Sequence, residues 1–181
     1  MNEPRTHRRA NRRRAKNFVP LSILRMSEAV RTVVQHPRRL DELVRMLGDK
    51  DLAVRGRAAA ALAKLSESHP ARLGRILARL KEALPDDSAR VRWHLVYTLG
   101  RLGSRFPAEL EGILKDLVPR LEDANRIVRI LACRTLGDIA ARRPSVVEGI
   151  FEHLKKDVPP SIARILRSAK KEPPRSARCR R

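Results

Sequence analysis

The chain has 181 residues, and its 41 Lys and Arg outnumber its 20 Asp and Glu to give a formal net charge of +21. Apolar residues make up 42% of the chain and aromatic residues only 3%. The apolar residues are mostly Leu, Ala, Val and Ile without a long alternating β-branched run, which favours helices over strands. No stretch approaches the roughly 20 apolar residues of a membrane span. We therefore expect a soluble, cytoplasmic, all-α protein with no membrane partner.

The N-terminal end is a basic arm. Residues 1–20 hold seven Lys or Arg and the single acid Glu3, a net charge of +6. They hold too few large apolar side chains to offset the entropy of ordering, so we expect a disordered arm over 1–19. Its arginines can neutralise phosphates, and the arm also fits a nuclear localisation signal, a nucleoid-associated protein or a solubilising tail. The candidate phosphate contacts are Arg8, Arg9, Arg12, Arg13 and Arg14.

An internal repeat of 37 residues fills the middle of the chain. The dipeptide Val-Arg begins at Val54, Val91 and Val128, and these positions are 37 residues apart. Other residue types keep the same spacing, among them Leu62, Leu99 and Leu136, and Pro70, Pro107 and Pro144.

Each unit predicts two antiparallel helices. A Pro opens the first helix, because its fixed φ and missing N–H suit the first helical position. A polar residue caps the second helix by accepting from an orphan backbone N–H. The expected caps, again 37 residues apart, are Asp51, Ser88 and Asn125.

The unit resembles the HEAT repeat, whose hallmarks are a Pro in the first helix, an Asp in the turn and a Val-Arg early in the second helix. The resemblance implies a ladder of bonds between Asp and Arg of stacked repeats. An armadillo unit is the nearest alternative, but it needs a third helix for which 37 residues leave little room. We therefore predict a short right-handed solenoid of antiparallel helix pairs. The expected ladder residues are Asp49, Arg55, Asp86, Arg92, Asp123 and Arg129.

The predicted solenoid spans residues 20–170. A cap helix covers 20–36, repeats cover 37–69, 70–106 and 107–143, and a shortened terminal helix pair covers 144–170. Residues 171–181 form a second basic, disordered tail. Cys133 lies in a helical pattern and Cys179 in the tail, which argues against a disulfide and favours a reducing compartment.

One candidate binding site stands out on the second helices. Trp93, Tyr97 and Arg101 are four residues apart, so they lie in one line on a helix, and Arg134 occupies the position equivalent to Tyr97 one repeat later. The resemblance implies that second helices line a concave groove, where Lys64 adds a further cation. Aromatic side chains there can stack on bases or hold a peptide side chain. The alternative is that Trp93 and Tyr97 only fill the seam between helices.

The sequence predicts a binding module rather than an enzyme, with no metal, no cofactor and no small-molecule substrate. The main hypothesis is nucleic-acid binding through the phosphate backbone, by the basic arms and a partly basic groove. The alternative is a protein–protein adaptor that holds a peptide or helix of an acidic protein on the concave face. A further alternative is a resemblance to alkyl-base DNA glycosylases built on HEAT-like solenoids, with Trp93 and Arg134 as the matching residues. The sequence departs from that pattern, because Tyr97 stands where an acid is wanted one turn after the Trp and Asp138 is a unit away.

Overall fold

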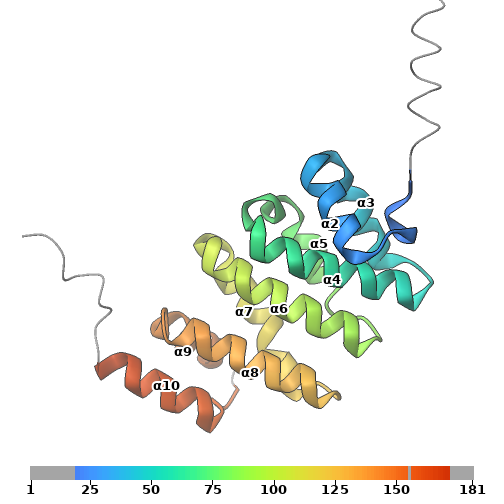
Figure 1. Cartoon of the computed structure of the whole chain (residues 1–181). Helices are drawn as coiled ribbons and strands as arrows, with labels where there is room; N and C mark the ends of the chain where they lie inside the picture. The colour runs from blue at the N-terminus through green and yellow to red at the C-terminus, as the bar shows by residue number, and fades with distance from the viewer. Residues whose placement is uncertain (1–18, 155, 172–181) are drawn as a thin grey trace, which may run out of the picture.

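A computed structural model describes residues 19–154 and 156–171 of the chain. Within these two ranges every regular element is an α-helix or a 3-10 helix (Figure 1), which confirms the all-α repeat solenoid predicted from the sequence. None of these helices is both long and apolar enough to cross a bilayer. The arginine cluster from Arg8 to Arg14 and most of the predicted basic tail lie outside the described ranges.

The second helices of successive units form one layer. Figure 1 shows them side by side, from the blue N-terminal end of the stack to its red C-terminal end. Each helix contacts the next one along the layer. In order, the helices are α2 (Met26–Gln35), α4 (Leu52–Ser68), α6 (Ala89–Arg105), α8 (Arg126–Ala140) and α10 (Pro160–Lys171).

In the three units before the last, the first helix combines 3-10 and α-helical turns, whereas in the last unit it is α-helical throughout. The prolines at 37, 70 and 107 each open a 3-10 helix, because proline lacks an N–H and fits only the first turn of a helix. The pieces are η2 (Pro37–Arg39), α3 (Leu40–Arg45) and η3 (Met46–Gly48); η4 (Pro70–Ile76) and α5 (Leu77–Glu82); η5 (Pro107–Glu109), α7 (Leu110–Leu117) and η6 (Val118–Glu122); and α9 (Pro144–His153).

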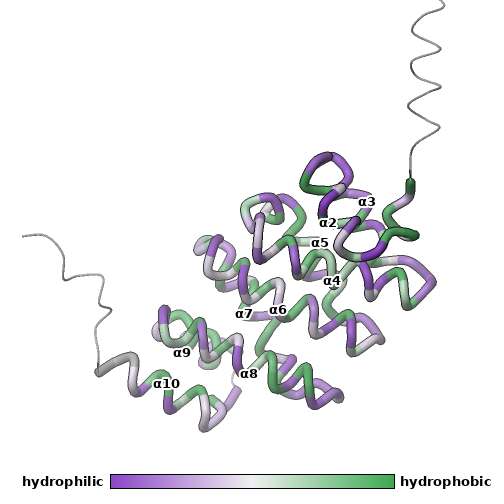
Figure 2. The backbone as a smooth tube through the Cα atoms, in the orientation of Figure 1, coloured by the Kyte–Doolittle hydropathy of each residue, from purple (hydrophilic) through white to green (hydrophobic). Residues whose placement is uncertain are grey.

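Apolar side chains from both layers meet in one continuous core. Figure 2 shows apolar positions recurring along the helices with polar positions between them. Leucines at equivalent positions of successive units are fully buried, and each contributes roughly 2 kcal/mol by leaving water. These leucines are Leu43, Leu80 and Leu117 in the first helices and Leu62, Leu99 and Leu136 in the second helices.

The caps of the second helices follow the prediction at two of three positions. Asp51 Oδ1 accepts from the Ala53 N–H at 2.7 Å, and Asn125 Oδ1 accepts from the N–H two residues on at 2.9 Å. The expected Ser88 cap is wrong, because its hydroxyl makes no capping bond. Ser88 does occupy the N-cap position of α6, so only the side-chain bond differs from the prediction. Ser88 is held instead through its own N–H, which donates to Asp86 at 2.7 Å.

Gly100 allows the close approach of α6 and α8. A Cβ built on Gly100 would lie 2.1 Å from Thr135 Cγ2, far inside the separation at which two carbon atoms repel. Thr135 is itself buried and β-branched, which restricts its rotamers. The absence of a side chain at Gly100 therefore sets how closely these two helices pack.

The last unit is shorter than those before it. Gly137, on α8, faces Ile165 of α10, where a built Cβ would lie 2.8 Å from Ile165 Cδ1, and these residues are 28 positions apart. Its equivalent one unit earlier, Gly100 on α6, faces Thr135 of α8, 35 positions away. The difference of seven residues corresponds to about two helical turns.

A side chain at Gly100 is predicted to destabilise the solenoid. Gly100→Ala forces α6 away from Thr135, and we expect it to lower the free energy of unfolding by about 1–3 kcal/mol. Gly149→Ala is the control, because Gly149 lies inside α9 with nothing within 4 Å of a built Cβ. That change should raise stability by up to about 1 kcal/mol through helix propensity. Urea unfolding followed by circular dichroism measures both, and equal effects of the two substitutions would contradict the close approach.

Candidate binding groove

A groove of about 470 Å³ lies between α6 and α8. Tyr97 and Arg101 line it from α6, and Arg134 and Asp138 line it from α8. Arg142, just beyond the end of α8, completes the lining at one end. Three arginines thus face one carboxylate, so the groove is positively charged.

The three arginines differ in how this chain holds them. Arg101 Nε donates to Ser66 O at 3.4 Å, which is a long and weak bond. Arg142 Nη1 donates to Ser104 Oγ at 3.2 Å. Arg134 is exposed, and it makes no hydrogen bond or ion pair with any residue that the structure describes. Arg134 therefore has all of its donors available to a ligand.

Tyr97 joins α6 to α4 at the edge of the groove. Its hydroxyl donates to Glu67 Oε1 at 3.0 Å, and Lys64 Nζ lies 2.6 Å from Glu67 Oε2. These bonds, that of Lys64 first, lower the pKa of Glu67 below its ordinary value. The Arg101 guanidinium lies 5.9 Å from the centroid of the Tyr97 ring, which is within the range of a cation–π contact. Glu67 therefore neutralises Lys64, while the charge of Arg101 stays in the groove.

An apolar patch lies one turn closer to the N-termini of the same two helices. It consists of Trp93 on α6 and of Ile127 and Ile130 on α8, whose residues are 37%, 63% and 55% exposed. The Trp93 indole packs on the His94 ring with 4.2 Å between centroids. Burial lowers the pKa of His94 to about 4, with a smaller effect from Arg90, so this imidazole is neutral near pH 7.

The structure brings together some of the residues that the sequence assigned to the groove. Tyr97, Arg101 and Arg134 line it. Trp93 is outside the lining, and Lys64 lies on α4 with its charge paired. Trp93 lies outside the cavity that Arg134 lines, so the two residues matched to a glycosylase do not meet in this cavity.

Sequence reasoning missed Arg142 and both isoleucines of the apolar patch. Ile130 is 37 residues after Trp93, so the repeat register could have predicted an exposed apolar side chain beside the tryptophan. Arg142 follows the end of α8, where no helical pattern indicates which way its side chain points.

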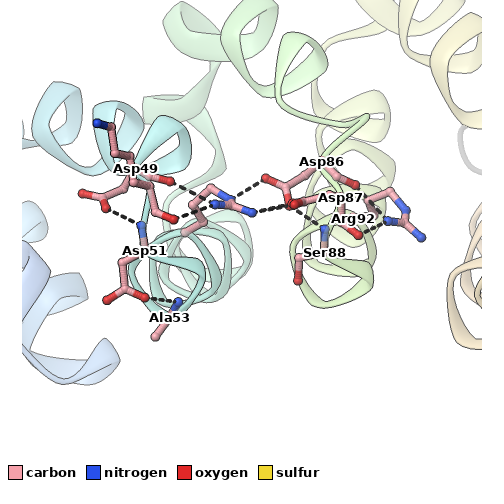
Figure 3. Close-up of polar contacts among 9 residues, drawn as sticks. Asp49, Asp51, Ala53, Asp86, Asp87, Ser88 and Arg92 are labelled. Carbon is pink, nitrogen blue, oxygen red and sulfur yellow. Dashed lines mark hydrogen bonds and ion pairs between the residues drawn. The ribbon is translucent and has the colours of Figure 1, made fainter.

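The Asp and Arg residues of successive units bond to one another near the turns between the two layers. Arg55 Nε donates to Asp86 Oδ2 at 2.8 Å, and Arg55 also pairs with Asp87. Figure 3 shows this step, with Asp49 and Asp51 on one unit and the residues from Asp86 on the next. The same arginine donates to Asp49 O at 3.0 Å. Each arginine thus joins the turn of its own unit to the turn of the next.

The second step of the ladder is bidentate and more buried. Arg92 Nε and Nη2 donate to the two carboxylate oxygens of Asp123 at 2.8 and 2.7 Å, and the Asp123 side chain is only 3% exposed. The Arg92 hydrogen bonds, with a further one from the Asn125 N–H, lower the pKa of Asp123. Arg129 occupies the equivalent position one unit later. Asp157 lies three residues before α10, as Asp123 lies before α8, but no hydrogen bond or ion pair joins it to Arg129. Arg129 donates instead to the backbone oxygens of Asp123 and Ala124, at 2.7 and 3.0 Å.

The described helices define a helical-repeat solenoid whose second helices carry a basic groove. The family description of HEAT repeats matches residues 76–170, which is more than half of the chain, and the chain belongs to the HEAT repeat family. No match was found among the curated proteins.

Solved structures with a similar fold include designed armadillo repeat proteins. One of them, in complex with the peptide (KR)4, is 20% identical with a TM-score of 0.57, over 80% of this chain and 67% of that chain. Another is 21% identical with a TM-score of 0.57, over 83% and 69% of the two chains. A third, computationally designed for modular peptide recognition, is 22% identical with a TM-score of 0.58, over 80% and 68%. At these identities the likeness shows the fold alone.

Loss of the buried ladder arginine is predicted to cost more than loss of the terminal one. Arg92→Ala leaves the Asp123 carboxylate buried without its main partner, and we expect a loss of about 3 kcal/mol at pH 7. Arg129→Ala removes bonds to backbone oxygens only and should cost about 1 kcal/mol. Urea unfolding of both variants measures the difference.

Acid should reduce the stability difference between the wild type and Arg92→Ala. The pKa of Asp123 is lowered in the folded chain, so its stabilisation is present above the ordinary Asp value of about 3.9 and is lost as the pH falls through the lower folded value. Wild type and Arg92→Ala should therefore approach each other in stability below about pH 4. A gap that stays constant from pH 7 to pH 3 would contradict the assignment of the bond to an ionised Asp123.

Proposed function

We propose that this chain is a non-enzymatic binding module that holds an acidic segment of a protein partner in the groove between α6 and α8. The observation that carries the proposal is the composition of that groove, in which Arg101, Arg134 and Arg142 face the single carboxylate of Asp138. Arg134 has no partner among the described residues, so its guanidinium is free to form a bidentate pair with a carboxylate.

The structural neighbours support a peptide as the ligand of such a surface. One of the designed armadillo repeat proteins is in complex with the basic peptide (KR)4, and another belongs to a set designed for modular peptide recognition. The groove of this chain is itself basic, so charge complementarity favours a partner of the opposite sign to that peptide.

Nucleic-acid binding is the second candidate function, and the charge of the chain ends favours it. Residues 1–20 and 167–181 each carry a net charge of +6, which leaves +9 for residues 21–166. Such clusters attract any polyanion through counterion release, without need for a shaped site. The two candidates therefore differ in whether binding depends on the groove or on total charge.

An acidic peptide is predicted to bind in the groove. In fluorescence-anisotropy titrations of the full chain, a labelled (Glu-Asp)4 peptide should bind, whereas a labelled (Lys-Arg)4 peptide should not. Arg134→Glu places a carboxylate in the groove and should weaken (Glu-Asp)4 binding by about fivefold or more. Arg79→Glu is the matched control, because it makes the same charge change on α5, outside the groove. Equal weakening by the two substitutions would show that the peptide responds to total charge and not to the groove.

Single-stranded DNA of about 20 nucleotides tests the second candidate in the same assay. If the arms alone attract phosphate, its affinity should fall steeply between about 50 and 200 mM salt, and Arg134→Glu and Arg79→Glu should weaken it to the same small extent. A selective loss with Arg134→Glu would instead make the groove a nucleic-acid site and would replace the peptide proposal.

A further inference from the structure

We propose that the apolar patch and the basic groove form one continuous recognition surface, and that the protein segment it binds carries large aliphatic side chains next to carboxylates. This inference rests on the proposed function and specifies the chemistry of the partner. It concerns Trp93, Ile127 and Ile130 together with Arg101 and Arg134.

The apolar half is accessible. Ile127 and Ile130 leave more than half of their surface in water, and Trp93 more than a third. The His94 ring, which is neutral near pH 7, packs against the indole. Three large apolar side chains at neighbouring positions of two packed helices make a contiguous surface, and surfaces of this kind mark interaction sites more often than isolated apolar residues do.

The two halves adjoin along the helices. Ile130 and Arg134 are four residues apart on α8, as are Trp93 and Tyr97 on α6, with Arg101 one turn further on. Four residues correspond to a rise of about 6 Å, and residues at this spacing share one face of a helix. One peptide backbone lying across both helices can therefore place one side chain on the isoleucines and the next carboxylate on Arg134.

A cation, Arg90, also flanks the patch on the side away from the groove. Arg90 is exposed one turn before Trp93 and lies against α4, where a Cβ built on Gly56 would be 3.5 Å from Arg90 Cδ. Gly56 is the equivalent of Trp93 one unit earlier and of Ile130 two units earlier, so the apolar row ends at α6. With neighbouring helices about 8–10 Å apart, the patch has room for two or three large side chains.

The chemistry of the patch favours a protein segment over a nucleic acid. Bases stack on aromatic rings, and Trp93 is the one aromatic member of the patch. Ile127 and Ile130 are aliphatic and more exposed than Trp93, so they match apolar side chains better than the flat faces of bases.

A random 12-residue peptide library, displayed on phage and panned against the full chain in about 0.3 M salt, tests the inference. The salt shortens the electrostatic reach of the terminal arms to a few ångströms. We expect the enriched peptides to combine Asp or Glu with Leu, Ile, Val or Met within a few residues. Panning is repeated on Ile130→Ser, with Ile23→Ser as the control, because Ile23 is equally aliphatic and 73% exposed but lies in η1 (Leu21–Ile23), at the other end of the stack.

The most enriched peptide is then labelled and titrated by fluorescence anisotropy. Ile130→Ser should weaken its binding about tenfold, the loss of one buried aliphatic contact, and Ile23→Ser should leave it unchanged. Circular dichroism of each variant shows whether it is folded, and Ile130 is exposed, so the substitution removes no core contact.

Each outcome separates this inference from the proposed function. Acidic peptides without an aliphatic preference, or binding unaffected by Ile130→Ser, would overturn the two-part surface while leaving the groove as an acidic-peptide site. If panning on the wild-type chain enriches no peptide above the level obtained with the Arg134→Glu variant, the proposed function itself is overturned. If sedimentation shows a dimer that Ile130→Ser converts to a monomer, the patch is an interface between copies of this chain and the inference is wrong.

Discussion

The rest of the structure depends on one constraint, which is that the apolar faces of each helix pair must be covered by the neighbouring pairs. The core is one continuous cluster running through all the described units, with fully buried leucines at equivalent positions of the three units before the last. A single pair exposes those leucines on its broad faces and cannot bury them alone, so stability comes from nearest-neighbour interfaces. The exposed faces of the second helices, including the groove, are fixed in place because the opposite faces are packed.

Polar contacts give this apolar stack a fixed register. Arg55 and Arg92 each bind the backbone of their own turn and a carboxylate of the following unit. Because each bond is directional, neighbouring units cannot slide by a turn without separating a partly buried charge pair. Gly100 adds a steric constraint at the middle of the α6–α8 interface. Together these contacts determine how closely Arg101 and Arg134 approach across the groove.

The repeat allowed most of the fold to be predicted from the sequence. A period of 37 residues predicted the helix pairs, the positions of the prolines and the buried leucines, because each of these depends on local spacing and on apolar patterning. The predicted capping bond of Ser88 was wrong, since it depends on the orientation of the hydroxyl, which the repeat spacing does not determine. The spacing predicted a shortened last unit but not that it is about two turns shorter, and it did not reveal that three of the first helices begin as 3-10 turns.

The candidate site was harder to predict, because exposure and pairing depend on neighbours from other units. The sequence indicated Lys64 as a free cation, but Glu67 holds it on one side and Tyr97 shares that carboxylate. It indicated Trp93 without its neighbours on α8, which are apolar and more exposed. Which of the three groove arginines lacks a partner among the described residues became visible only once α6 and α8 were packed together.

Trp93 and Tyr97 are the only tryptophan and tyrosine of the chain, and both lie along the proposed recognition surface. Near-ultraviolet absorption and intrinsic emission of this protein therefore originate almost wholly from this one region. The rest of the solenoid, built from leucine, alanine and arginine, is optically silent at these wavelengths. Emission from a half-exposed indole shifts to shorter wavelength when water leaves it, so the unlabelled protein has its own optical reporter of whether that surface is occupied.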